Sequence, residues 1–115
     1  MDYQNRNFKK MVNQSVIETA KRYIQSIPKS MEIKKAYLFG SYAKGNEHID
    51  SDIDIAIVVG RMDDFFSIQM QLMRLRRTID LRIEPHPILK NDFDHNDPLS
   101  YEILKYGIII RNFVA

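Results

Sequence analysis

Apolar residues recur at helical spacing near the start of the chain and form short runs after it. Between residues 11 and 27 they return every three or four positions, which predicts an amphipathic helix that Pro28 ends. Residues 36–39 form an apolar run that stops at Gly40, which is typical of a buried strand. Residues 40–50 are polar, so we expect a loop or a short helix there.

The middle of the chain predicts two more strands around a helix. Residues 51–59 read SDIDIAIVV, a β-prone segment that Gly60 terminates. A helix is expected from Asp63 or Asp64 to about Thr78, with basic residues in its last turn. A third strand is expected over Ile79–Ile83, closed by the two prolines that follow at 85 and 87.

The closing residues predict one more helix and one more strand. Asp97 followed by Pro98 is a strong helix start, Gly107 marks its end, and residues 108–111 are expected to return as a strand. The order of elements indicates an α/β (α+β) fold, with helices packed on a short sheet. With 115 residues, the segment 1–115 is expected to form one domain.

Composition narrows the class of protein. The chain has 17 Lys and Arg against 15 Asp and Glu, a net charge of +2, so direct nucleic-acid binding is not expected. It has no cysteine, which excludes disulfides and thiolate metal sites, and the three histidines are not spaced as a zinc set. No apolar run approaches the roughly 18 residues that a membrane span needs, and the N-terminus is too polar for a signal peptide. We therefore expect a soluble, cytoplasmic protein that does not contact a membrane.

Two aspartates stand two residues apart in the strand predicted over residues 51–59. Side chains alternate between the faces of a strand, so Asp52 and Asp54 point to one face, roughly 7 Å apart at the backbone. Aspartate is disfavoured in strands and neighbouring carboxylates repel each other, so a plain solvent-facing strand explains the pair poorly. A divalent cation removes this repulsion, and oxygen ligands favour Mg²⁺, Mn²⁺ or Ca²⁺.

A third acid, Asp80, lies in the third predicted strand. If that strand neighbours the one with the acid pair, Asp80 shares the face of Asp52 and Asp54. Three acids on one face suit a two-metal site for phosphoryl or nucleotidyl transfer, with ions about 4 Å apart. Taken alone, Asp80 is equally compatible with a surface aspartate. Glu84, four residues later, can line the same face, although a surface or supporting position is the simpler interpretation.

The segment after the first strand has features of an anion-binding loop. Residues 40–45 read GSYAKG, and a strand followed by Gly-Ser and a short helix leaves backbone N–H groups free for an anion. Gly40 permits a phosphate to approach the backbone, Ser41 can donate its hydroxyl, and Lys44 can neutralise phosphate charge. For Ser41 alone a helix N-cap is the simpler interpretation, and Lys44 is equally compatible with a solvated charge. The P-loop and GxGxxG patterns are both missing.

Taken together, Gly40-Ser41, ten further residues and then Asp52-Ile53-Asp54 resemble the signature of the DNA polymerase β superfamily of nucleotidyltransferases. Asp80 and the apolar strand before Gly40 match the same pattern. Residues 97–110, which read DPLSYEILKYGIII, resemble the minimal nucleotidyltransferase (MNT) branch, whose members are often paired with HEPN-domain proteins in toxin–antitoxin modules. The resemblance extends over nearly the whole chain.

The resemblance implies a polymerase-β-like fold, a short mixed sheet flanked by helices, and Mg²⁺-dependent transfer of a nucleoside monophosphate to an acceptor hydroxyl. Asp52 and Asp54 would be catalytic and would bind two Mg²⁺ ions that carry the triphosphate. Asp80 would help to hold the ion at the acceptor hydroxyl and would take its proton. Gly40 and Ser41 would contact the outer phosphates, beside Lys44, and pyrophosphate would leave.

By the same resemblance ATP is the expected donor, and a tyrosine of a HEPN-domain toxin is the expected acceptor. The chain would then act as an antitoxin by AMPylation. Larger relatives carry an extra domain that binds the acceptor, and this chain has none, so the acceptor surface is expected from a partner or a second copy. A hetero-oligomer or a homodimer would provide it.

Two alternatives remain open on the sequence. The chain can be a non-catalytic antitoxin that neutralises a HEPN ribonuclease by binding alone, which suits its small size. It can also modify a small molecule, as the aminoglycoside nucleotidyltransferases do, although no substrate domain supports that. Asp52→Asn separates the first alternative from catalysis, because neutralisation by binding alone would survive the substitution.

Overall fold

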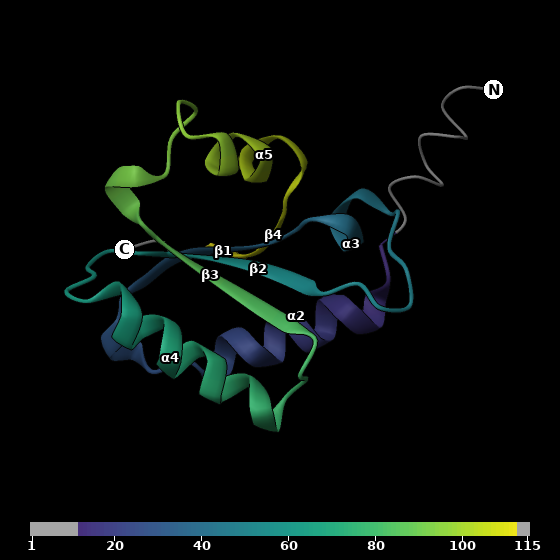
Figure 1. Cartoon of the computed structure of the whole chain (residues 1–115), viewed down its shortest axis with the longest axis horizontal. Helices are drawn as coiled ribbons and strands as arrows, with labels where there is room; N and C mark the ends of the chain where they lie inside the picture. Colours follow the sequence, from purple (N-terminus) through teal and green to yellow (C-terminus); the bar gives the residue numbers. More distant parts are fainter. Residues whose placement is uncertain (1–11, 113–115) are drawn as a thin grey trace.

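A four-stranded mixed sheet with helices on both faces makes up the computed structural model, which describes residues 12–112 (Figure 1). The helices α2 and α4 cover one face of the sheet, and α5 covers the other. The elements in chain order are α2 (Gln14–Ser26), a 3₁₀ turn (Lys29–Met31), β1 (Ile33–Phe39), α3 (Ser41–Lys44), β2 (Ile53–Val59), α4 (Phe65–Leu75), a 3₁₀ turn (Arg76–Thr78), β3 (Ile83–Leu89), a 3₁₀ turn (Lys90–Asp92), α5 (Pro98–Tyr106) and β4 (Ile108–Asn112).

The strands lie in the order β3-β2-β1-β4. The central strand β1 is antiparallel to both β2 and β4, whereas β2 and β3 are parallel and are joined through α4. A parallel pair needs such a crossover connection, because a hairpin turn joins only antiparallel strands. The mixed sheet flanked by helices that the sequence led us to expect is therefore confirmed.

The helix α2, which corresponds to the helix expected over residues 11–27, begins only at Gln14. The side chain of Asn13 accepts hydrogen bonds from the backbone N–H groups of Ser15 (2.9 Å) and Val16 (3.4 Å), which makes Asn13 the N-cap and Gln14 the first helical residue. The earlier part of the expected helix, at Met11, lies outside the described residues. The helix ends at Ser26, two residues before Pro28, as predicted.

Two hydrophobic layers hold the helices to the sheet. In the larger layer, between the sheet and α2 and α4, the buried Tyr23 hydroxyl donates a 2.7 Å hydrogen bond to the carbonyl of Leu72 and so ties the two helices together. In the smaller layer, Ile103 of α5 packs against the opposite face of the sheet. That second face also carries the polar ends of β2 and β3, so α5 borders the region where the candidate chemistry lies.

The third strand was predicted in the wrong place. It does not span Ile79–Ile83 but begins at Ile83 and continues through Pro85 and Pro87 to Leu89. Prolines usually end a strand because they lack an N–H group, but β3 is an edge strand. The Arg82 carbonyl accepts from the N–H of Ile53 at the start of β2, so by alternation both prolines turn their missing N–H toward the free edge.

Side chains of the α4 region complete the hydrogen bonding along that free edge. Arg76 Nη1 donates to the carbonyls of Leu81 (3.2 Å) and Ile83 (2.9 Å), and Gln69 Nε2 donates to that of Pro85 (3.2 Å). The segment predicted as strand, residues 79–82, is a turn instead. Because this edge has lost two donors and three of its carbonyls already have partners, β3 is protected against further strand pairing.

The last helix and strand lie where the sequence predicts them. Asp97 is the N-cap of α5, and its side chain accepts from the N–H of the buried Ser100 at 2.8 Å. The helix ends at Tyr106, immediately before Gly107, and β4 pairs with β1. None of the helices within residues 12–112 is long and apolar enough to cross a membrane.

Candidate active site

The turn after β1 places a glycine directly against a carboxylate of β2. Phe39, the last residue of β1, pairs with Asp54, so the next residue, Gly40, lies beside the Asp54 side chain. A Cβ atom at Gly40 would collide with Oδ2 of Asp54. Gly40 also has φ 76° and ψ −153°, a conformation that is essentially restricted to glycine. Both the backbone and the neighbouring carboxylate therefore require glycine here.

The Gly-Ser segment leads into the single turn of α3, whose buried side chains hold it against the sheet. Tyr42 and Ala43 are buried in the larger hydrophobic layer, and this fixes the turn against the sheet. Gly40 occupies the N-cap position and Ser41 is the first helical residue, so the simpler interpretation of Ser41 as the N-cap is wrong. The Ser41 side chain is half-buried at the same end of the sheet as Asp54.

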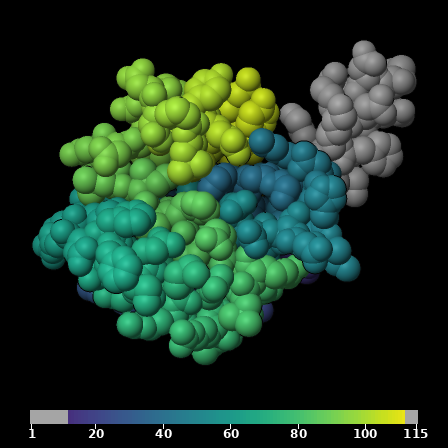
Figure 2. All heavy atoms as spheres, in the orientation of Figure 1, coloured from purple at the N-terminus to yellow at the C-terminus, as the bar shows by residue number. Residues whose placement is uncertain are grey.

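Lys44 points away from the Gly-Ser turn, toward α5. Its ammonium group forms a 3.5 Å ion pair with Glu102 and lies 5.2 Å from the ring centroid of Tyr106. The blue atoms of α3 and the yellow-green atoms of α5 adjoin each other in Figure 2. Lys44 therefore connects α3 to α5, and it would have to exchange Glu102 for a phosphate to play the predicted role.

The two aspartates of the DID sequence differ in their surroundings. Asp52 immediately precedes β2 and is exposed, whereas Asp54 is the second residue of β2 and its side chain is only 25% exposed. Asp54 lies between Phe39 of β1 and Glu84 of β3, its register partners on the two sides. Its Oδ1 is 3.1 Å from Nε2 of His86 on β3. Asp54 is thus held from several sides, while Asp52 faces solvent.

Asp80 lies in the turn before β3, where it is engaged by Arg82. Its Oδ2 is 2.8 Å from Nη2 of Arg82, and its Oδ1 accepts from the Arg82 backbone N–H at 2.9 Å. These contacts with Arg82, the side-chain hydrogen bond first, hold the pKa of the Asp80 carboxyl below its usual range. Within residues 12–112, no three His, Asp or Glu side chains are gathered closely enough to hold a metal ion. The structure thus does not bring Asp80 together with Asp52 and Asp54, and its role as a ligand stays a prediction.

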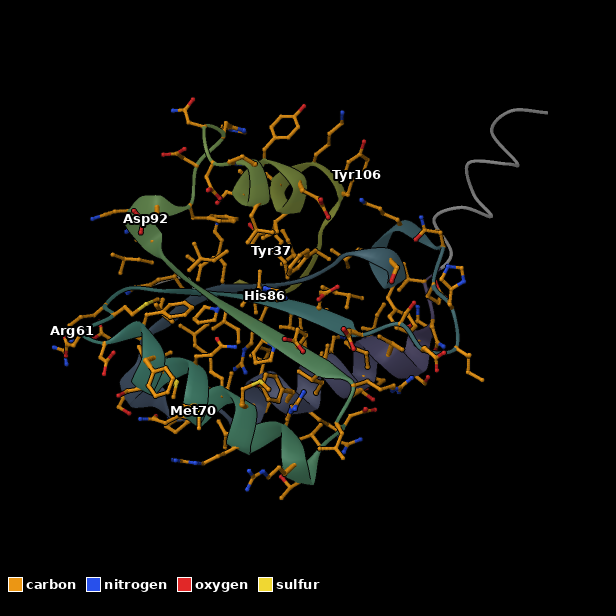
Figure 3. All side chains as sticks on the ribbon, viewed as in Figure 1. Tyr37, Arg61, Met70, His86, Asp92 and Tyr106 are labelled. Carbon is orange, nitrogen blue, oxygen red and sulfur yellow. The ribbon has the colours of Figure 1, made fainter. Side chains whose placement is uncertain are left out.

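Glu84 and His86 are the two site residues that sequence reasoning undervalued. Glu84 is the register partner of Asp54 in the parallel pair, so both side chains point to the same face of the sheet. Its carboxylate is 40% exposed and lies 3.9 Å from Nη1 of Arg76. His86, two residues further along β3, shares that face (Figure 3). Their even spacing was visible in the sequence, but their position followed only once the strand was known to pass through its prolines.

The acid pair has the donor chemistry of a magnesium site. Mg²⁺ is usually bound through one or two carboxylates together with substrate phosphates, and it keeps several waters. Asp52 supplies an exposed carboxylate, and Asp54 presents Oδ2 next to the Gly-Ser turn, where phosphate oxygens have access to backbone N–H groups. The residues present therefore fit a divalent cation that is shared with a phosphorylated substrate.

Fold and site together define a small α+β domain in which a Gly-Ser turn lies against Asp54 of the following strand, with Asp52 immediately before that strand. That combination is the one expected for nucleotidyl transfer. The comparison with protein families agrees, since residues 18–112 match the family described as Polymerase beta, Nucleotidyltransferase. This chain belongs to that nucleotidyltransferase family, and the resemblance first suggested by the GS and DxD residues is confirmed.

Solved structures share the fold over most of the chain. A toxin–antitoxin crystal structure with AMP-PNP is 25% identical, with a TM-score of 0.58, over 89% of this chain and 75% of that one. A putative nucleotidyltransferase from Sulfolobus solfataricus is 20% identical, with a TM-score of 0.58, over 87% and 86%. The complex of a tri-AMPylated Shewanella oneidensis HEPN toxin with an MNT antitoxin is 20% identical, with a TM-score of 0.55, over 87% of this chain and 72% of that one. The last two show the fold alone, and no curated protein matches.

Proposed function

We propose that this chain transfers AMP from Mg·ATP to a hydroxyl group of a HEPN-domain partner and thereby acts as an antitoxin. The observation that carries the proposal is the contact between Gly40 and the Asp54 carboxylate. This contact brings a turn able to hold phosphate against a carboxylate able to hold the cation that accompanies phosphate. Neither group is explained by packing, because Gly40 adopts a backbone conformation that costs other residues about 1–3 kcal/mol.

Each residue of the site has a role in this proposal. Asp52 and Asp54 hold Mg²⁺, which when bound neutralises the charge that develops on the departing pyrophosphate. The backbone at Gly40 and the Ser41 hydroxyl hold the outer phosphates, so that the α-phosphate lies toward the acid pair. The acceptor oxygen then forms a bond to the α-phosphorus while the bond from that phosphorus to pyrophosphate breaks.

The acceptor hydroxyl must lose its proton to a third carboxylate, and Glu84 is placed better than Asp80 for this task. Glu84 shares the face of Asp54 in direct register and makes only a 3.9 Å ion pair with Arg76, whereas Asp80 would first have to release its 2.8 Å ion pair with Arg82. Asp80→Asn and Glu84→Gln distinguish the two. Loss of transfer in Glu84→Gln with transfer retained in Asp80→Asn supports Glu84, and the reverse pattern supports Asp80.

The nature of the partner rests on the similar structures. The 25%-identical toxin–antitoxin structure contains AMP-PNP, and the Shewanella complex contains an AMPylated HEPN toxin. A HEPN tyrosine is the acceptor that we propose.

Nucleotide binding is the first test, since it needs no acceptor. Thermal unfolding is followed with ATP alone, with Mg²⁺ alone and with both, for the wild type and for Asp52→Asn/Asp54→Asn. Ligand at about 100 times its dissociation constant adds roughly 2.7 kcal/mol, which is several degrees for a domain near this size. Asp63→Asn is the matched control, because Asp63 is 82% exposed and lies beyond the other end of β2. A shift that needs both ligands and persists only in the wild type and the control supports the site.

Transfer is tested next, with α-labelled ATP and a HEPN-domain protein offered as the acceptor. Label on the partner that disappears in Asp52→Asn supports catalysis. If Asp52→Asn still neutralises the toxin as well as the wild type does, the alternative holds and the chain is an antitoxin by binding alone. If Mg·ATP binds but no label moves to any partner, the transferase proposal is wrong.

A further inference from the structure

A histidine reaches across the sheet to the buried carboxylate of the site. His86 lies on β3 and is in register with Ala56 of β2, not with Asp54, yet its Nε2 is 3.1 Å from Oδ1 of Asp54. The ring therefore leans over Ala56 to the residue diagonal to its own partner. Diagonal neighbours on one face of a sheet are within reach of long or aromatic side chains.

Two features of the sheet permit and fix this position. Ala56 is fully buried and small, so a ring can lie across it without a clash. On the far side, the Phe39 ring of β1 meets the imidazole edge to face, with centroids 4.9 Å apart and an interplanar angle of 68°. The His86 ring thus contacts both the Phe39 ring from β1 and the Asp54 carboxylate from β2, and these two contacts fix its position.

The hydrogen bond orients the two oxygens of Asp54 differently. An ionised carboxylate can only accept hydrogen bonds, so in this pair the N–H at Nε2 of His86 donates to Oδ1 of Asp54. The other oxygen, Oδ2, is the one that lies against the α-carbon of Gly40. With Oδ1 held by His86, rotation of the carboxylate about its χ2 bond is restricted and Oδ2 stays at the Gly-Ser turn. A ligating carboxylate that is itself hydrogen-bonded in this way binds its metal more tightly.

We infer that His86 is a positioning residue that holds Asp54 so that Oδ2 meets a divalent cation beside the Gly-Ser turn. The inference rests on the proposed function for the identity of the site, but it concerns cation binding alone. His86 touches neither the nucleotide nor the acceptor in this scheme and acts through Asp54. The donor nitrogen is what matters, and the ring itself is not required.

The experiment compares His86→Ala, which removes the donor, with His86→Gln, whose amide Nε2 places a donor at similar reach. His95→Ala is the control, because His95 is an exposed histidine in the loop before α5. The probe is Mn²⁺ alone, followed by electron paramagnetic resonance without nucleotide or partner. Loss of a hydrogen bond to a metal ligand typically weakens metal binding about 10–100-fold. We expect that loss in His86→Ala, a dissociation constant within about threefold of the wild type in His86→Gln, and no change in His95→Ala.

The outcomes separate this inference from the proposed function. Equal Mn²⁺ affinity in the wild type and a folded His86→Ala overturns the role of His86 and leaves the transferase proposal intact. Equal weakening in His86→Ala and His86→Gln, at unchanged thermal stability, also overturns it and indicates that the imidazole binds the metal directly. If His86→Gln keeps Mn²⁺ affinity while the wild type transfers no AMP, the inference stands and the function fails. A wild type that binds no Mn²⁺ without nucleotide overturns the inference about His86, whereas the transferase proposal is decided by the thermal shift with Mg·ATP.

Discussion

Gly40→Ala offers the sharpest test of the contact between the Gly-Ser turn and the Asp54 carboxylate. Alanine at φ 76° and ψ −153° costs about 1–3 kcal/mol for the backbone alone. The new methyl group also meets Oδ2 of Asp54, so the carboxylate must shift and its other oxygen, Oδ1, loses the hydrogen bond with His86. A hydrogen bond to a charged group contributes about 1.5–3 kcal/mol, and partial exposure of both side chains places this loss at the lower end. We expect a total of about 3–4 kcal/mol, or roughly 12–16 °C in Tm.

The two contributions separate in a double-mutant cycle. Asp54→Ala removes the atom that clashes but leaves the backbone conformation of Gly40 unchanged. Urea denaturation of the wild type, both single variants and the double variant then gives the coupling energy. Gly40→Ala should cost about 1–2 kcal/mol less in the Asp54→Ala protein than in the wild type. The assay needs neither a metal nor a partner, so it tests the structure alone.

Gly45→Ala is the matched control, because Gly45 has the same φ of 76° as Gly40 and stands at the other end of α3. Its cost of about 1–2 kcal/mol should be the same whether or not Asp54 is present. An identical cost of Gly40→Ala in both backgrounds would refute the contact with Asp54. A cost near zero would refute the left-handed backbone as well.

Three further substitutions test the turn before β3 and the core. Asp80→Asn should lower the free energy of unfolding by about 1 kcal/mol at pH 7. Because Arg82 lowers the pKa of Asp80, this difference from the wild type should persist above pH ~4 and disappear as the pH falls through the folded-state pKa. Urea denaturation over a range of pH measures it. Tyr23→Phe should cost about 1 kcal/mol at pH 7. Burial raises the pKa of the Tyr23 hydroxyl, so the wild type should lose stability above pH ~10 more steeply than Tyr23→Phe in the same assay. Leu72→Ala should cost about 2–5 kcal/mol, measured by thermal unfolding; an unchanged Tm would contradict its place in the core.

Elements whose boundaries depend only on neighbouring residues were predicted correctly from the sequence. The helix start at Asp97-Pro98, the strand ending at Phe39 and the turn at Gly40 each depend on residues within a few positions of one another, and each lies where it was predicted. Asp52 and Asp54 were paired by the same kind of local reasoning, from the alternation of one strand, but β2 begins only at Ile53 and the role of the two aspartates stays a prediction. Membership of the nucleotidyltransferase family followed from this local set of residues.

The third strand was misplaced because its location depends on a partner that local sequence does not reveal. Pro85 and Pro87 end a central strand but are tolerated where their missing N–H groups face a free edge. Only the pairing with β2 identifies β3 as an edge. Residues 79–83 looked like a strand because apolar and polar residues alternate there, yet hydrogen bonds back to Arg76 close them into a turn.

This misplacement bears directly on the chemistry of the site. A strand over residues 79–83 puts Asp80 on the face of Asp54, whereas a strand that begins at Ile83 puts Glu84 there. The parallel register then sets His86 two residues beyond Glu84, above the small Ala56, where it can reach Asp54. The start of β3 at Ile83 therefore determines that Glu84, and not Asp80, shares the face of Asp54, and it also brings His86 within reach of Asp54. The contacts of Asp80 with Arg82 stabilise the turn that precedes β3, and the role of Asp80 as a metal ligand stays a prediction.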